Sequence, residues 1–148
     1  EHTEVLLQIL EGLDEDIPCI QRPPLEPVNV FEFAQHNLLH GCLLEGFSAL
    51  LLYWQAQNVD AGTLKTIYTQ LAKDEIEHAQ LAWDIHLWIV SLLEPDQQSL
   101  LQQMWMEHIQ RLPEMIRAEA MPFVGIGLPD EQQLIQLAGV FGEHLRAA

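Results

Sequence analysis

A carboxylate and an imidazole stand three residues apart inside an apolar helical stripe, and this pair restricts the possible folds of the chain. Glu75 and His78 lie in the segment K-D-E-I-E-H-A-Q-L-A-W, residues 73–83. Residues three apart share one face of a helix, and apolar residues continue this face at helical spacing: Leu64, Leu71, Ala82, Ile85 and Ile89. An unpaired charge among apolar side chains is strongly unfavourable. The pair therefore needs a metal ion or another charged group as its partner.

A third unusual residue, Glu45, lies thirty positions before Glu75. It is the only Asp, Glu, Lys or Arg between Glu32 and Asp60, in the run H-G-C-L-L-E-G-F-S-A-L-L-L-Y-W. Four residues share its helical face: Leu38, Cys42, Ala49 and Leu52. Two successive helices thus each place a carboxylate on an inward face, and the second adds a histidine. This is half of the carboxylate-bridged two-metal pattern found in some helical bundles.

Amphipathic segments without strand-like alternation predict an all-α fold. The prolines and the acidic run of residues 14–28 predict an extended connection, and the short turn 58–62 predicts antiparallel helices on its two sides. Asp60 or Thr63 is expected to cap the helix after that turn. The predicted helices are 2–13, 29–57, 64–93, 96–112, 114–120 and one from Asp130 to about Leu145.

Helix ends are predicted from capping residues and prolines. Asn29 followed by Glu32 three positions later is a capping box. Pro95 and Pro113 are expected to end the helices that precede them, because proline cannot continue the helical hydrogen-bond pattern.

The net charge of −16, with only six Lys and Arg among 148 residues, excludes the usual binders of nucleic acid and of anionic membranes. The scarcity of Lys and Arg also weakens the explanation that Glu75 and His78 form an ion pair with a cation, because the nearest ones, Lys65 and Lys73, do not lie in line with them along the helix. No apolar run is long enough to cross a bilayer. The two cysteines, Cys19 and Cys42, are expected to be free thiols in a reducing compartment, which predicts a cytoplasmic protein.

The segments G-C-L-L-E-G-F-S-A-L-L from Gly41 and D-E-I-E-H-A-Q-L-A-W from Asp74 resemble the second helical pair of bacterial ferritin-like domain proteins, over about residues 33–90. The resemblance implies a ferritin-like antiparallel helical bundle, here with a C-terminal helical extension. It also implies a non-haem site for two iron ions, or for iron with manganese. Since Glu1-His2 stands where the family's first E-x-x-H ends, the implied metal ligands are Glu45, Glu75, His78 and His2.

This resemblance implies an oxidoreductase or oxygenase that activates dioxygen or peroxide, with an unknown small-molecule substrate or redox partner. Glu45 would be a terminal ligand, Glu75 would bridge two ions, and His78 would supply a nitrogen. The family's first Glu helix would precede Glu1. We therefore expect residues 1–148 to form one domain that is completed by helices before Glu1 or by a homodimer.

Two other interpretations stay open. The chain could be an acidic helical interaction module with one metal ion or none. It could also be a helical scaffold in which Glu75 and His78 hydrogen-bond to each other or to Glu45.

The remaining histidines are not expected to bind the same metal. His36 and His40 lie on the side of their helix roughly opposite Glu45, which predicts surface or packing positions. His86 is on the inward face about 16 Å from Glu75 along the helix, so it would line a channel or pair within the core. Surface positions are also expected for His108 and His144, and core positions for the four tryptophans: Trp54, Trp83, Trp88 and Trp105.

Overall fold

The computed structural model describes residues 29–119 and 126–147, and the regular structure of these ranges is entirely helical. The prediction of an all-α chain is confirmed for these residues. The expected helix 2–13, the connection 14–28 and Cys19 lie outside them. The elements are α2 (Val30–His36), η1 (Asn37–Glu45), α3 (Gly46–Asn58), α4 (Thr63–Val90), α5 (Pro95–Glu119) and α6 (Glu131–Ala147).

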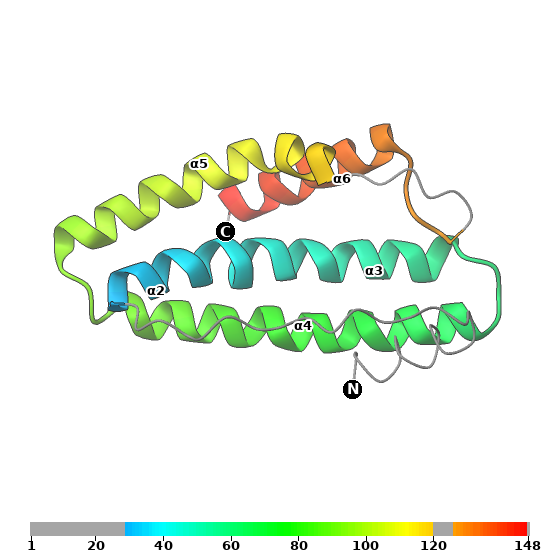
Figure 1. Cartoon of the computed structure of the whole chain (residues 1–148), viewed down its shortest axis with the longest axis horizontal. Coiled ribbons are helices and arrows are strands. Elements are labelled where there is room, and N and C mark those ends of the chain that lie inside the picture. Colours follow the sequence, from blue (N-terminus) through cyan, green and yellow to red (C-terminus); the bar gives the residue numbers. More distant parts are fainter. Residues whose placement is uncertain (1–28, 120–125, 148) are drawn as a thin grey trace, which may run out of the picture.

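The helices form layers around one central rod. α2, the π-helix η1 and α3 follow one another without a break and make up this rod, which lies in the middle of Figure 1. α4 runs back along one side of the rod, as the short turn predicted, and α5 and α6 cover another side. Among the helices described, none combines the length and the apolar character needed to span a bilayer.

Two clusters of buried side chains hold these layers together. The first joins the rod to α4 and to the start of α5, through Ala34, Leu38, Cys42, Ala82, Ile89, Leu93 and Leu101. The second joins the rod to α5 and α6, through Leu43, Phe47, Ile109, Leu112, Leu134 and Ala138. The rod is therefore packed on both sides, while α4 contacts the rod along one face only.

The predicted capping box at the start of the rod is confirmed. The Asn29 side chain accepts a hydrogen bond of 2.9 Å from the Glu32 amide, and the Glu32 carboxylate accepts one of 3.1 Å from the Asn29 amide. The predicted cap of α4 is wrong, because Gly62 takes that position with φ 149° and no side chain of the described residues caps the helix. Glycine adopts this backbone conformation without the steric strain that a residue with a β-carbon, such as aspartate or threonine, would have at position 62.

Pro113 does not end its helix, contrary to the prediction. α5 continues through it to Glu119, although residue 113 has no N–H for the carbonyl oxygen of Ile109. Ile109 and Leu112 are buried before the proline, and Ile116 packs against the same cluster after it. Burial of these side chains stabilises the continued helix by about 1.5–3 kcal/mol each, which offsets a proline cost of about 3 kcal/mol.

The expectation of a core position is wrong for Trp88, which is 62 % exposed. Leu64, placed on the inward stripe by its spacing, is also exposed. Trp83 and Trp105 pack against the first cluster and against each other, with ring centroids 5.3 Å apart. Trp88 is exposed because only one face of α4 meets the rod. Its neighbour Ile89 lies on that face, and Trp88 projects about 100° away from Ile89 around the helix axis.

Candidate metal centre

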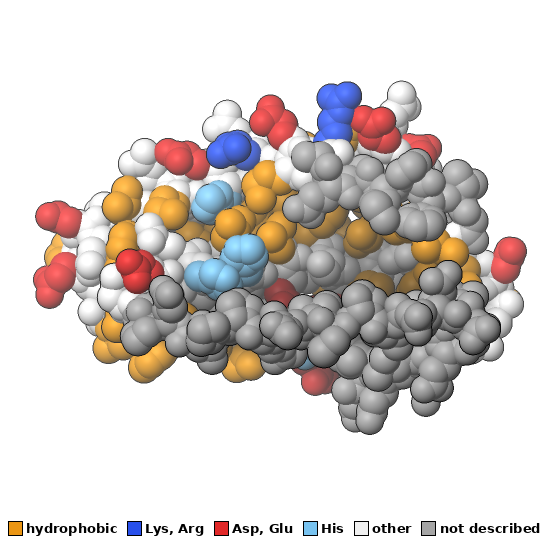
Figure 2. All heavy atoms as spheres, in the orientation of Figure 1, with side chains coloured by type: hydrophobic (Ala, Val, Ile, Leu, Met, Phe, Trp, Pro, Cys, Tyr) orange, Lys and Arg blue, Asp and Glu red, His pale blue; other side chains and the backbone are white. Residues whose placement is uncertain are grey.

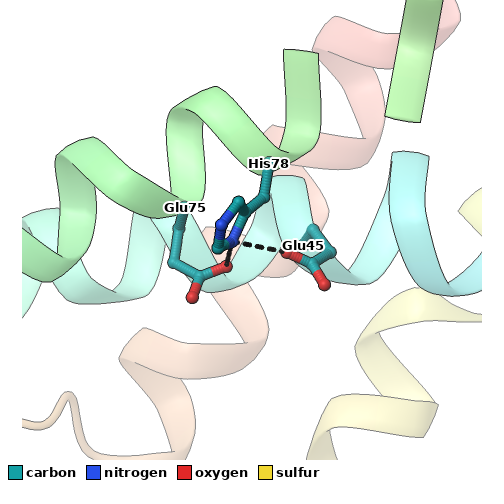
Figure 3. Close-up of side chains that lie close together, drawn as sticks. All are labelled: Glu45, Glu75 and His78. Atoms are coloured by element: carbon teal, nitrogen blue, oxygen red, sulfur yellow. Dashed lines mark ion pairs between the residues drawn. The ribbon is translucent and has the colours of Figure 1, made fainter. Parts of the chain in front are cut away.

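Glu45, Glu75 and His78 converge from the rod and from α4, as the sequence predicted. Each offers one ligand atom, and these atoms all lie within 4.8 Å of one another. Figure 3 shows the two carboxylates pointing toward the same imidazole. Among the described residues this is the only group of three His, Cys, Asp or Glu side chains arranged in this way.

The separations within the group are those of loose ion pairs, a little longer than in a hydrogen-bonded cluster or in a coordination shell. The Nδ1 atom of His78 lies 3.6 Å from Oε2 of Glu45 and 3.6 Å from Oε2 of Glu75. This is too long for a hydrogen bond. Ligand atoms that share one ion with bonds of about 2.1 Å stand roughly 3–3.5 Å apart. A small inward movement of the side chains would therefore let them share a metal ion.

Helical spacing positions the two residues of α4. Glu75 and His78 are three residues apart, so one turn places both on the side that faces the rod. The flanking acids behave differently: Glu77 is exposed, and Asp74 accepts a hydrogen bond of 2.9 Å from Gln70. The spacing thus selects Glu75 from three neighbouring carboxylates.

Glu45 is the last residue of η1, a π-helix of nine residues. A π-helix closes i→i+5 hydrogen bonds, so it changes the direction in which later side chains project. Single π-turns often accompany functional sites, and longer ones are rare. Sequence reasoning missed this element, because no residue pattern in Asn37–Glu45 distinguishes it from an α-helix.

The centre lies partly open to solvent. The exposed fraction of the side chain is 16 % for Glu75, 41 % for Glu45 and 53 % for His78. The acids are therefore more protected than the imidazole.

His2, the fourth implied ligand, lies outside the described residues. The other described histidines do not join the cluster. His36 and His40 stack with ring centroids 4.3 Å apart, and Figure 2 shows histidine side chains gathered on one face, with acidic side chains around it. Burial lowers the pKa of His40, and the nearby His36 and His108 lower it further. Exposed positions are confirmed for His36, His40 and His144, whereas His108 is half-buried.

His86 lies on the rod-facing side of α4 and lines a cavity between α4, α5 and the rod. Burial lowers the pKa of its imidazole. Cys42 is also buried, and burial raises the pKa of its thiol to about 12. Such a thiol is a poor metal ligand, because metals bind the thiolate.

Comparisons with protein-family models, with curated proteins and with solved structures find no match to this chain.

Proposed function

We propose that the chain is a ferritin-like protein that binds iron, or iron with manganese, at Glu45, Glu75 and His78. We further propose that it acts as an oxidoreductase toward dioxygen or peroxide. The observation that carries the proposal is the convergence of three ligand atoms within 4.8 Å of one another from two helices, although Glu45 and Glu75 are thirty residues apart in sequence.

The donor set fits these metals. Two carboxylate oxygens and one imidazole nitrogen suit iron and manganese, whereas copper(I) prefers thiolate and thioether donors. Three protein ligands are enough to hold one ion with positions left for water or a reactant. A second ion would need donors outside the described residues, and the resemblance to ferritin-like proteins assigns His2 to that role.

When bound, iron would supply one-electron redox chemistry toward dioxygen or peroxide. The chain's own contribution would be to bind the metal ion and to neutralise its charge. The two glutamates would balance the two positive charges of a divalent ion, and His78 would complete the donor set from the more exposed side. The half-buried setting would limit the access of water while admitting a small oxidant.

One observation favours the second interpretation, an acidic helical interaction module with one ion or none. Leu81 and Trp88 of α4 are more than half exposed and lie seven residues apart, hence on one helical face. Exposed apolar side chains on one face are typical of protein–protein contacts. Under this interpretation the ion would stabilise the rod and α4 without redox turnover.

Metal content per chain separates these possibilities. Protein produced with added iron and manganese is analysed by inductively coupled plasma mass spectrometry, together with Glu45→Ala, Glu75→Ala and His78→Ala. Two control variants remove an acid and a histidine outside the cluster: Glu77→Ala and His144→Ala. Circular dichroism confirms that each variant is folded.

We expect the three cluster variants to lose most of the bound metal and the two controls to keep it. Wild-type metal content in both glutamate variants would show that these residues are not ligands. The metal-loaded protein is also tested for oxidation of Fe(II) and consumption of peroxide. If both rates equal those of Glu75→Ala, the oxidoreductase proposal is rejected and the interaction module remains.

A further inference from the structure

A cavity of about 420 Å³ lies between α4, the first turns of α5 and the central rod. Val90 and Pro95 in its lining place it near the end of the molecule where α4 leads into α5, an end that can be followed in Figure 1. Its size falls within the range of small-molecule sites in proteins. None of its lining residues belongs to the metal centre, and the nearest of them on α4, Trp83, is five residues beyond His78, about 7.5 Å along the helix.

The ring of Trp83 is nearly perpendicular to two other aromatic rings in the lining, those of His86 and Trp105. The ring centroids of Trp83 and His86 are 5.5 Å apart with planes at 85°, and those of Trp83 and Trp105 are 5.3 Å apart with planes at 87°. Leu38, Val90 and Leu101 add aliphatic surface. Such walls present ring faces and edges to a planar aromatic guest.

The described residues of the lining include no Asp, Glu, Lys or Arg, although the chain carries a net charge of −16. Their polar groups besides His86 are the indole N–H groups of Trp83 and Trp105 and three neutral side chains of α5: Gln98, Ser99 and Gln102. Burial lowers the pKa of His86, so this ring is neutral at pH 7. An uncharged lining favours an uncharged ligand, because a buried charge would have no partner there.

The hydrogen bonding of His86 specifies one more feature of the ligand. Its Nδ1 atom is sealed from solvent and has no hydrogen-bond partner among the described residues. A neutral imidazole carries one proton, and a buried N–H without an acceptor is less favourable than a buried lone pair without a donor. The proton therefore belongs on Nε2, which leaves the ring one hydrogen-bond donor for a ligand.

We propose that this cavity binds a small, uncharged, planar aromatic compound whose carbonyl oxygen accepts a hydrogen bond from Nε2 of His86. The tryptophan walls bind the ring system, and the histidine selects for the carbonyl. Nothing in this assignment depends on the metal at Glu45, Glu75 and His78.

Coumarin is a suitable probe, because it is uncharged, planar and bicyclic, and it carries a ring carbonyl. Naphthalene has similar size and shape but no acceptor. Binding of each probe to the whole chain is measured by equilibrium dialysis. Ser99→Phe and Gln102→Phe each place a bulky ring at the cavity from an exposed position of α5. Ser48→Phe is the matched control, since Ser48 is exposed on α3 and outside the lining.

We expect saturable binding of one coumarin per chain, a loss of at least about tenfold in affinity in Ser99→Phe and Gln102→Phe, and no change in Ser48→Phe. In His86→Phe, coumarin affinity should fall by about three- to tenfold, as for one lost hydrogen bond, while naphthalene affinity should stay within about twofold. Glu75→Gln should bind coumarin like the wild type, which keeps this test distinct from that of the metal centre.

The proposal is overturned if coumarin shows no saturable binding, or if Ser99→Phe and Gln102→Phe both bind coumarin with wild-type affinity. Equal losses of coumarin and naphthalene affinity in His86→Phe would refute the hydrogen bond assigned to His86.

Discussion

The side-chain amide of Asn37 in η1 donates a hydrogen bond of 2.9 Å to the main-chain carbonyl oxygen of Ala82 in α4. The thiol of Cys42 donates to the same oxygen at 3.5 Å. Both side chains are buried. Ala82 is one helical turn after His78, and Cys42 is three residues before Glu45, so these contacts join the rod to α4 next to the candidate metal centre. They hold the π-helix in register with the helix that carries the other two ligands.

Asn37→Asp should destabilise the fold more than Asn37→Leu. The carboxylate would face the Ala82 carbonyl oxygen without a donor, at a cost of about 3 kcal/mol or more in the free energy of unfolding. Leucine removes the hydrogen bond but introduces no charge. Urea unfolding followed by circular dichroism measures both variants. An Asn37→Asp protein as stable as the wild type would show that this hydrogen bond does not hold the interface.

Gly41→Ala should weaken the same interface. A β-carbon at Gly41 would lie 2.7 Å from Cβ of Ala82 and 2.9 Å from Oδ1 of Asn37, so the helices must separate. Overpacking of this kind costs about 1–3 kcal/mol, more than the gain of up to about 1 kcal/mol from alanine's helix propensity. We also expect lower metal content, because the shift moves Glu45 away from α4.

Gly139→Ala is the control for this substitution. Gly139 also lies within a helix, α6, but a β-carbon added there would meet no atom of the described residues within 4 Å. Alanine there should raise the free energy of unfolding by about 0.5–1 kcal/mol. If both glycine variants change stability in the same direction, close approach at Gly41 is not the cause.

The stability of the protein should fall as the pH drops below 6.5. Burial lowers the pKa values of His40, His86 and His108 from that ordinary value. The unfolded chain therefore takes up protons first, and the free energy of unfolding decreases from pH 6.5 down to the folded-state pKa values. Urea unfolding between pH 7.5 and pH 5 measures this slope.

His86→Phe should make this slope shallower, because it removes one of the three groups. His144→Phe changes an exposed histidine and should leave the slope close to that of the wild type. Equal slopes in the wild type and in His86→Phe would show that His86 is not held neutral by burial.

Cys42 should react slowly with thiol reagents while the protein is folded. Its thiol is fully buried and its pKa is raised to about 12, so almost no thiolate is present at pH 8. In a Cys19→Ser background, reaction with 5,5′-dithiobis(2-nitrobenzoate) should be at least about a hundredfold slower in buffer than in 8 M urea. Similar rates in the two solvents would mean that Cys42 is accessible in the folded protein.

Part of this architecture follows from local sequence rules. The Asn29–Glu32 capping box depends on residues one turn apart, and the shared face of Glu75 and His78 depends only on helical periodicity. The short turn before α4 was enough to predict that Glu45 would face this pair. Each of these inferences involves either neighbouring residues or one tight connection, so the sequence carries them directly.

Other features depend on contacts between distant segments. α5 passes through Pro113 because Ile109, Leu112 and Ile116 are buried against the rod and α6. Trp88 remains exposed because only one face of α4 meets the rod, and the cavity beside His86 forms where α4, α5 and the rod come together. The sequence by itself thus determined the helical class of the described residues, the capping box of the rod and the common helical face of Glu75 and His78. Only the tertiary structure decided the π-helix, the exposed face of α4 and the cavity, because packing energy between helices outweighs the local preferences on which sequence reasoning relies.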